Sequence, residues 1–136
     1  MPCNHTIHKH QHHFGWDNSI DPILSVAPGK TVEIETIDSS GGQLSAHSSL
    51  DDLLKLSFDK VNPVTGPIFI EGAQVGDAVA VTFLDFQPSG WGWTANIPGF
   101  GLLADQFTDP ALHIWEYDKQ SMAPAMYGPG GKVPLK

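Results

Sequence analysis

The chain contains no arginine: its seven basic residues are all lysines, against fifteen Asp and Glu, and the formal net charge over 136 residues is −8. Proteins that bind nucleic acid or an anionic membrane use a cationic face to reach the phosphates. The charge balance therefore argues against nucleic acid, a membrane surface and anionic substrates as partners.

Cysteine is also scarce. Cys3 is the single cysteine, so no disulfide can form within the chain, which suits a reducing compartment. Cys3 lies near the N-terminus with no fixed base close by, so we do not assign it as a nucleophile. The N-terminus has no apolar signal segment, and no run of about eighteen apolar residues occurs. We expect a cytoplasmic protein.

The chain has few charges and many turn-forming residues. Charged residues make up 16% and hydrophobic residues 40%, with fourteen Gly and eleven Pro. A chain of this length fits one domain. The many Gly and Pro, together with few helical windows, predict a turn-rich, mainly β fold.

Four stretches have the composition of strands. Residues 31–38 alternate, with Val32, Ile34 and Thr36 on one face, which predicts a half-buried strand. Residues 78–86 are apolar on both faces and are the strongest strand candidate, expected at the centre of a sheet. Shorter strands are expected at the start of residues 68–77, before a tight turn at Gly76 and Asp77, and at residues 112–117.

One short helix is predicted over residues 49–56. Ser49 precedes Asp52 by three positions, as in a capping box, and Leu50, Leu53 and Leu54 share one face. Strands of this length with one helix favour a β-sandwich or jelly-roll-like domain over residues 1–118. Residues 119–136 are rich in Pro and Gly and are expected to form a connector or tail.

Residues 88–101, PSGWGWTANIPGFG, are expected to form a loop rather than a regular strand or helix. They hold Trp91 and Trp93 together with four Gly and two Pro. Two interpretations stay open: a loop that grips a ligand, or a stiff connector whose rings fill a core.

Five of the seven histidines lie in residues 5–13. If this segment is extended, His8, His10 and His12 share one face and could bind zinc or nickel. The spacing matches no established metal motif, so a solvated terminal strand with adventitious metal affinity is the alternative. His12 and His13, nearest the body of the fold, are the candidates we retain.

Three polar side chains lie at strand ends or turns. Asp38 opens a Gly-rich loop, either as a functional carboxylate or as the cap of an Asx turn. Asn62 and Glu71 flank a short predicted strand and could face a pocket, although Asn before Pro63 is also ordinary turn chemistry. The chain has no nucleophile elbow, phosphate loop or zincin motif, so spacing alone supports no enzyme.

Three longer segments change this interpretation when they are taken in order. They are residues 12–43, 62–77 and 90–103, and together they resemble the N-terminal half of the acetamidase/formamidase family over residues 5–118. The resemblance implies a hydrolase that converts formamide or acetamide to ammonia and a carboxylate. It also implies a β-rich fold, homo-oligomers and a bound divalent metal, zinc first. Such an ion supplies a hydroxide near neutral pH and polarises the amide carbonyl.

The resemblance also assigns candidate site residues. The Thr-x-Asp of the family's early strand falls on Thr36 and Asp38, and its His-His start falls on His12 and His13. The resemblance thus places catalytic groups at Asp38, Asn62 and Glu71, metal ligands at Asp38, His12 and His13, and a substrate pocket at Trp91, Trp93 and Thr65.

Members of this family are considerably longer, and their C-terminal half carries further Asp, His and Glu residues. The chain therefore pairs with a second polypeptide that holds this half, is a shortened form, or has lost activity. Strand edges that the other half would cover favour self-association as a dimer or larger homo-oligomer. Two alternatives stay open. One is a non-catalytic β-sandwich that binds a small neutral ligand through Trp91 and Trp93 or acts as a scaffold. The other is a metal-buffering protein that uses the histidine-rich terminus.

Overall fold

The computed structural model describes residues 5–121, 125–127 and 131–133, and Cys3 lies outside them. The chain forms two compact units, the first of Met1–Gly42 and Ser57–Thr82, the second of Gln43–Leu56 and Phe83–Lys136. The expected division into a domain at 1–118 and a tail at 119–136 stays a prediction. Within the described ranges, no helix has the length and apolar character needed to cross a bilayer.

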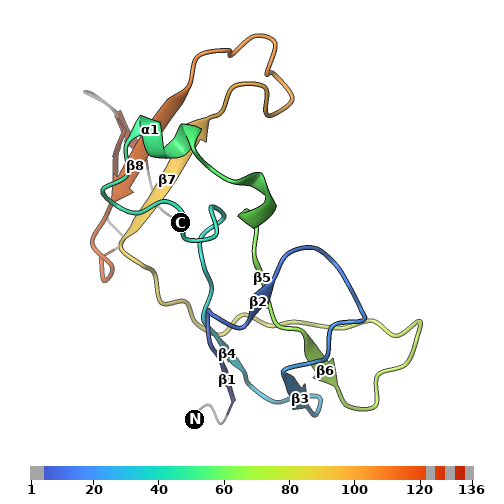
Figure 1. Ribbon diagram of the computed structural model, residues 1–136. Coiled ribbons are helices and arrows are strands. Elements are labelled where there is room, and N and C mark those ends of the chain that lie inside the picture. The colour runs from blue at the N-terminus through green and yellow to red at the C-terminus, as the bar shows by residue number, and fades with distance from the viewer. Residues whose placement is uncertain (1–4, 122–124, 128–130, 134–136) are drawn as a thin grey trace. The chain divides into compact units, whose positions relative to one another are not determined.

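The first unit is built from three strand pairs (Figure 1). They are β1 (Thr6–Ile7) parallel to β4 (Glu33–Ile34), β2 (His12–His13) antiparallel to β5 (Val64–Thr65), and β3 (Leu24–Val26) parallel to β6 (Ile68–Ile70). A short 3-10 helix, η1, covers Phe58–Lys60. The side chains of Ile7 and Val26 are buried in this unit. The expected strand at the start of residues 68–77 is confirmed as β6, and the turn after it by the bond from the Asp77 N–H to the Gln74 oxygen, 3.0 Å.

The extended segment that would place His8, His10 and His12 on one strand face is not formed. The backbone N–H of Gln11 donates to the His8 carbonyl oxygen at 2.8 Å, and the His8 N–H donates to the Gln11 side-chain oxygen at 2.8 Å. These two bonds close a turn, so the chain reverses between β1 and β2. The rings of His8 and His10 stack with centroids 5.6 Å apart, and His12 belongs to a different strand.

The strand expected over residues 31–38 is shorter and less covered than its alternation predicts. Only Glu33 and Ile34 pair with β1, and the side chain of Ile34 is 46% exposed. The expected burial of Ile34 is therefore wrong. The alternation identifies a strand, but burial depends on a second layer that the sequence pattern does not specify.

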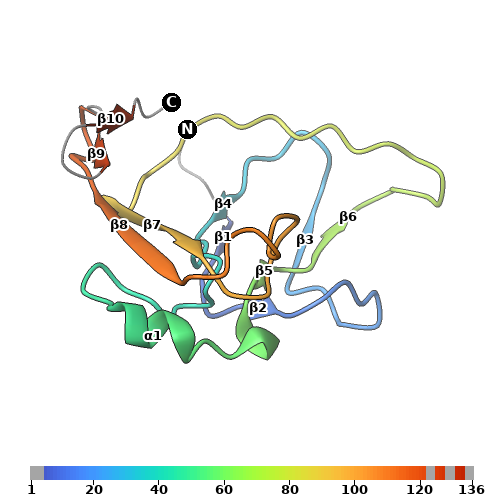
Figure 2. The same cartoon turned by 90° about the horizontal axis from the view of Figure 1, so that it is seen from above.

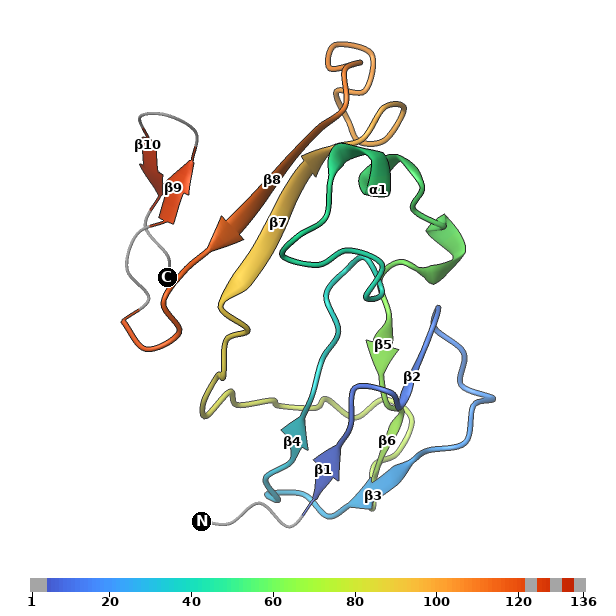
Figure 3. The same cartoon turned by 60° about the vertical axis from the view of Figure 1, so that its left-hand side comes forward.

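The second unit contains the longest strand pair, β7 (Trp91–Asn96) antiparallel to β8 (Ala111–Glu116) (Figure 3). The predicted strand at 112–117 is confirmed as β8. The helix α1 (Leu50–Leu54) contacts β8 and buries Leu53. Farther along the chain, β9 (Ala125–Tyr127) pairs antiparallel with β10 (Gly131–Val133).

The predicted helix is confirmed together with its cap. The Ser49 hydroxyl accepts from the Asp52 N–H, and the Asp52 carboxylate accepts from the Ser49 N–H at 2.8 Å. This reciprocal capping satisfies two backbone donors that a helix start leaves without partners. The cap and the burial of Leu53 together stabilise a helix of only five residues.

The expectation of a loop throughout residues 88–101 is wrong. Residues 91–96 form β7, in which Trp91 lies opposite Glu116 and Gly92 opposite Trp115. Alternating aromatic residues suit a strand, and here a full-length partner outweighs the low strand propensity of glycine. The loop begins only after Asn96.

Residues 78–86, expected to form a central strand, form no regular strand in the structure. Figure 2 draws the connection between β6 and β7 as a long coil. The fold class, mainly β with one short α-helix in the described residues, is confirmed. The sandwich arrangement stays a prediction, because the described strands form separate two-stranded sheets.

Candidate functional site

The β2–β5 pair brings two of the predicted site residues together. His12 lies opposite Thr65, and His13 lies opposite Val64. Neighbouring residues of a strand point to opposite faces, so His12 and Thr65 share a face that His13 does not. Directly paired residues have Cβ atoms about 4.5–5.5 Å apart. The Thr65 hydroxyl donates to the backbone oxygen of Glu35 at 3.3 Å, which ties this face to the chain that follows β4.

Both candidate histidines are oriented by backbone carbonyls. Nδ1 of His12 lies 2.7 Å from the Lys9 oxygen, and Nδ1 of His13 lies 3.2 Å from the Gly66 oxygen. A carbonyl only accepts, so Nδ1 carries the proton and, in the neutral ring, Nε2 carries the lone pair. Metal-ligating histidines are commonly oriented in this way. Each ring can therefore offer Nε2 to a metal, but on opposite faces of the strand, so one ion would take one of the two.

Asp38 forms an Asx turn. Its Oδ1 accepts the Ser40 N–H at 2.9 Å and the Ser40 hydroxyl, and its Oδ2 accepts the Gly42 N–H at 3.2 Å. Ser40 is fully buried, so this carboxylate satisfies a polar group inside the first unit. The Asx turn expected as one interpretation of Asp38 is therefore formed. Its ligand or base role stays a prediction.

The loop after Asp38 is fastened to the chain around Asn62. The Asn62 N–H donates to the Ser39 oxygen at 2.8 Å, and Asn62 has a positive φ of 53°. A Cβ added at Gly41 would overlap the backbone oxygen of Lys60. The structure thus brings Asp38 and Asn62 onto adjoining segments, as it brings His12 and Thr65 onto paired strands.

Glu71 belongs to a different part of the first unit. It follows β6, where its N–H donates to the Val26 oxygen at 2.9 Å and its carboxylate accepts the Ser25 hydroxyl at 3.1 Å. Both bonds go to the chain at β3. The hydrogen bonds described for Glu71 therefore do not reach Asn62, its expected counterpart across the short strand.

Glu35, which is not among the candidate site residues, contacts the turn between β1 and β2. Its Oε2 lies 3.1 Å from the Lys9 N–H and 3.3 Å from Nδ1 of His8. The Lys9 N–H first, and His8 second, hold the pKa of Glu35 below its ordinary value. No spacing rule reveals this contact, because it depends on the parallel register of β1 and β4.

The predicted metal requires more donors than one neighbourhood of this chain offers. Among the residues that the structure describes, no group of three or more His, Cys, Asp or Glu is gathered closely enough to hold an ion. His12, His13 and Asp38 fit as single donors by their chemistry. They do not amount to a complete site.

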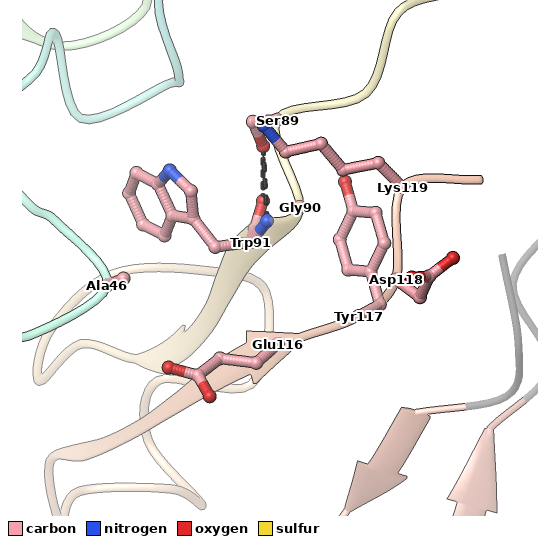
Figure 4. A pocket seen from close by; sticks show the side chains of 8 residues that line it. All are labelled: Ala46, Ser89, Gly90, Trp91, Glu116, Tyr117, Asp118 and Lys119. Carbon is pink, nitrogen blue, oxygen red and sulfur yellow. Dashed lines mark hydrogen bonds between the residues drawn. The ribbon is translucent and has the colours of Figure 1, made fainter. Parts of the chain in front are cut away.

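The second unit contains an open hollow of about 570 Å³ beside the start of β7. Figure 4 shows the Trp91 ring on one side of Gly90 and the Tyr117 ring with the Lys119 chain on the other. The Ser89 hydroxyl donates to the Trp91 oxygen at 2.7 Å and the Tyr117 N–H donates to the Gly90 oxygen at 3.0 Å, which fixes the rim. The lining residues are Ala46, Ser89, Gly90, Trp91, Glu116, Tyr117, Asp118 and Lys119.

This hollow contains one of the three residues predicted to line a substrate pocket. Trp93 is two positions along β7 and shares the face of Trp91. Thr65 belongs to the first unit. The grouping of Trp91, Trp93 and Thr65 in one pocket stays a prediction.

Known proteins resemble this chain along residues of both units. The model of the Acetamidase/Formamidase family matches residues 3–129. The chain belongs to this family. It is 34% identical over 113 residues to a formamidase from Methylophilus methylotrophus and 30% identical over 121 residues to an acetamidase from Mycolicibacterium smegmatis. It also superposes on a crystal structure of an acetamidase from Bacillus halodurans with a TM-score of 0.82 at 28% identity.

The chain spans only part of the length of these family members. The matches cover 79% of this chain but 28% and 30% of the two curated relatives. The match to the solved acetamidase covers 96% of this chain and 42% of that protein. More than half of each relative therefore has no counterpart in the matched region.

Proposed function

We propose that this chain forms the N-terminal part of an amide hydrolase that cleaves short aliphatic amides, with formamide and acetamide as the substrate class. The observation that carries the proposal is the family match along residues 3–129. The relatives named formamidase and acetamidase supply the substrate class. The acidic, arginine-free chain suits a neutral substrate of this kind.

In the proposed reaction, water adds to the amide carbonyl carbon, the C–N bond breaks, and the nitrogen leaves as ammonia after taking a proton. Asp38 is the candidate base, since its carboxylate is held rigidly by Ser40 and Gly42. The Asn62 side chain, on the adjoining segment, is the candidate donor to the carbonyl oxygen. Glu71 is the third candidate. Its carboxylate is bonded to Ser25 of β3, and none of its described hydrogen bonds goes to Asp38 or Asn62.

We further propose that a divalent metal, zinc first, is shared between this chain and the remainder of the family fold. When bound, it would polarise the amide carbonyl and lower the pKa of a water molecule. Nε2 of His12 or His13 and an oxygen of Asp38 are the donors this chain would contribute. The other ligands would come from outside the described residues, since those contain no complete set.

We also propose that the protein is cytoplasmic. It would pair with the C-terminal half of an amidase or form a homo-oligomer. On this proposal the chain alone hydrolyses little or no amide. A low rate follows because general base, carbonyl donor and metal ligands have to act together.

The test couples metal analysis to ammonia release. The chain is co-expressed with the C-terminal remainder of the Bacillus halodurans acetamidase, and zinc content and ammonia from formamide are measured with and without that remainder. His12→Ala and His13→Ala are compared with His47→Ala, an exposed histidine of the other unit. We expect one of the first two variants to lose zinc and activity and His47→Ala to keep both. Equal zinc content in all three variants would show that neither His12 nor His13 binds the metal.

The hollow beside Trp91 favours a second candidate function, the binding of a small neutral ligand without catalysis. Trp91 and Tyr117 offer flat apolar faces, and Glu116, Asp118 and Lys119 offer polar groups around them. The test is tryptophan fluorescence during titration with sugars and with acetamide. Trp91→Phe should abolish the response, whereas Trp16→Phe, at a ring that is 92% exposed in the first unit, should leave it unchanged. A response that survives Trp91→Phe would exclude this hollow.

A further inference from the structure

Glu35, which directly follows β4, is bonded to three other segments of the first unit. Its N–H donates to the Ile7 oxygen in β1 at 2.9 Å, and its carbonyl oxygen accepts the Thr65 hydroxyl in β5 at 3.3 Å. Its carboxylate accepts the Lys9 N–H, in the turn between β1 and β2, at 3.1 Å. Two bonds to its backbone thus fix the position of Glu35, and the carboxylate acts on the turn.

Lys9 links this carboxylate to His12, the candidate metal ligand. The Lys9 N–H donates to the Glu35 carboxylate, and the Lys9 carbonyl oxygen lies 2.7 Å from Nδ1 of His12. Both bonds are made by the backbone of one residue. A carboxylate that holds the Lys9 N–H therefore also limits where the Lys9 oxygen lies, and so which orientation of the His12 ring can bond to it.

The bond to Lys9 selects one state of the His12 ring. A carbonyl oxygen only accepts, so Nδ1 of His12 carries the proton, and Nε2 of the neutral ring carries the lone pair. The Phe14 ring meets the His12 ring edge to face with centroids 5.4 Å apart, which restrains the plane of the imidazole. A histidine in this tautomer, with its ring held in place, can offer Nε2 to a metal ion.

We infer that Glu35 is a positioning residue for His12: its carboxylate, acting through the Lys9 backbone, holds His12 as the Nδ1–H tautomer with Nε2 as the donor atom. The inference rests on the proposed function, in which His12 is a candidate ligand of the shared metal. Loss of a group that orients a ligating histidine typically lowers metal affinity about 10–100-fold. The Glu35 side chain is 46% exposed and acts through a second residue, so we expect an effect near the lower end of that range.

A purely structural role for Glu35 is the competing explanation. Its carboxylate also lies 3.3 Å from Nδ1 of His8, so its contacts could serve only to hold β1 beside β4. The carboxylate of Glu33 supplies the comparison, because it accepts the Thr6 hydroxyl at 3.3 Å and so bonds β1 from within β4. If strand pairing alone mattered, removal of either carboxylate would affect His12 equally.

The first experiment determines the tautomer of His12 in the full chain from the nitrogen NMR chemical shifts of its ring at about pH 8, where an ordinary imidazole is neutral. We expect Nδ1–H in the unsubstituted chain and a mixture of both tautomers in Glu35→Ala. Glu35→Gln should restore Nδ1–H, because its amide oxygen can still accept the Lys9 N–H. Glu33→Ala should keep Nδ1–H, and the ring of His13, whose Nδ1 has a different acceptor, should not change in any variant.

Three results would overturn the inference: a proton on Nε2 of His12 in the unsubstituted chain, an unchanged His12 ring in Glu35→Ala, or an equal change in Glu33→Ala. Amide hydrogen exchange of β3 and β6 shows whether the first unit stays folded. Should Glu35→Ala unfold it, Glu35→Asp takes its place, because it keeps the charge but is one methylene shorter. The same mixture of tautomers is expected there, and an unchanged ring would again overturn the inference.

The second experiment measures the zinc affinity of the complex with the C-terminal remainder of the Bacillus halodurans acetamidase. We expect about tenfold weaker binding in Glu35→Ala, and binding close to that of the unsubstituted chain in Glu35→Gln and Glu33→Ala. A changed His12 ring with unchanged zinc affinity would contradict the proposed role of His12 as a ligand and leave the positioning role supported. Weaker zinc binding with an unchanged His12 ring would overturn the positioning role and leave the shared metal site supported.

Discussion

The backbone N–H of Asn62 donates to the carbonyl oxygen of Ser39 across 2.8 Å. This bond joins the Gly-rich loop that Asp38 opens to the segment that leads into β5. It places two of the candidate catalytic residues on adjoining stretches of chain that lie far apart in the sequence. The stability of this junction is therefore the structural basis of the proposed site.

Gly41 is the position where the junction tolerates no side chain. It has a positive φ of 71°, and an added Cβ would overlap the Lys60 backbone oxygen. Gly41→Ala should lower the free energy of unfolding by about 3 kcal/mol or more, since a left-handed backbone and a backbone clash act together. Gly29→Ala is the control, with φ 81° and open space around it, and should cost about 1–2 kcal/mol. Equal losses in urea unfolding would show that the loop does not pack on Lys60.

Asp38 can be separated into a turn role and a ligand role. Asp38→Ala removes the acceptor of the Ser40 and Gly42 N–H groups and should cost about 1–3 kcal/mol. Asp38→Asn keeps one carbonyl oxygen and should restore part of that stability. We expect zinc affinity of the co-expressed complex to fall about tenfold or more in both variants, because an amide is a weaker ligand than a carboxylate. Wild-type zinc affinity in Asp38→Asn would leave Asp38 with the turn role alone.

The contact of Glu35 with Lys9 and His8 predicts a dependence of stability on acid. These contacts lower the pKa of Glu35 in the folded chain from its ordinary value of 4.5. A lowered folded-state pKa gives stability that is complete above pH 4.5 and is lost as pH falls through the lowered value. Glu35→Gln should flatten the dependence of the unfolding free energy on pH below pH 4.5. Parallel curves for the wild type and Glu35→Gln would refute the contact.

Removal of the helix cap should destabilise the second unit. Ser49→Ala removes the side chain that accepts from the Asp52 N–H and should cost about 1 kcal/mol. Ser49→Thr keeps a hydroxyl in place and should stay close to the wild type. Thermal unfolding followed by circular dichroism measures the difference, and identical midpoints for the two variants would mean that the cap contributes nothing.

The sequence was sufficient where the determinants were local. The capping box at Ser49 and Asp52 and the turn from Gln74 to Asp77 both depend on residues three positions apart, and both were predicted correctly. The failures arose where a distant partner decided the outcome. Residues 91–96 form a strand because β8 pairs with them, although their glycines suggested a loop. Residues 78–86 have the pattern of a central strand, but the described chain contains no partner for them.

The candidate site also combines what the sequence could identify with contacts that it could not. The family motifs identified His12, Asp38, Asn62 and Thr65 as candidates. No spacing rule could show that strand pairing places His12 opposite Thr65, or that the Asn62–Ser39 bond joins the segments of Asn62 and Asp38. Glu35 was missed as a candidate because its contact with Lys9 depends on the β1–β4 register. Glu71 was named with the others, yet its hydrogen bonds go to β3.

The most direct test of the account is ammonia release from formamide by this chain, alone and in complex with the C-terminal remainder of a family member. The account predicts little or no ammonia from the purified 136-residue chain, and zinc-dependent release from the complex that Asp38→Asn abolishes. Full turnover by the chain alone would contradict the shared site. A stable, zinc-loaded complex that releases no ammonia would contradict the proposed function itself.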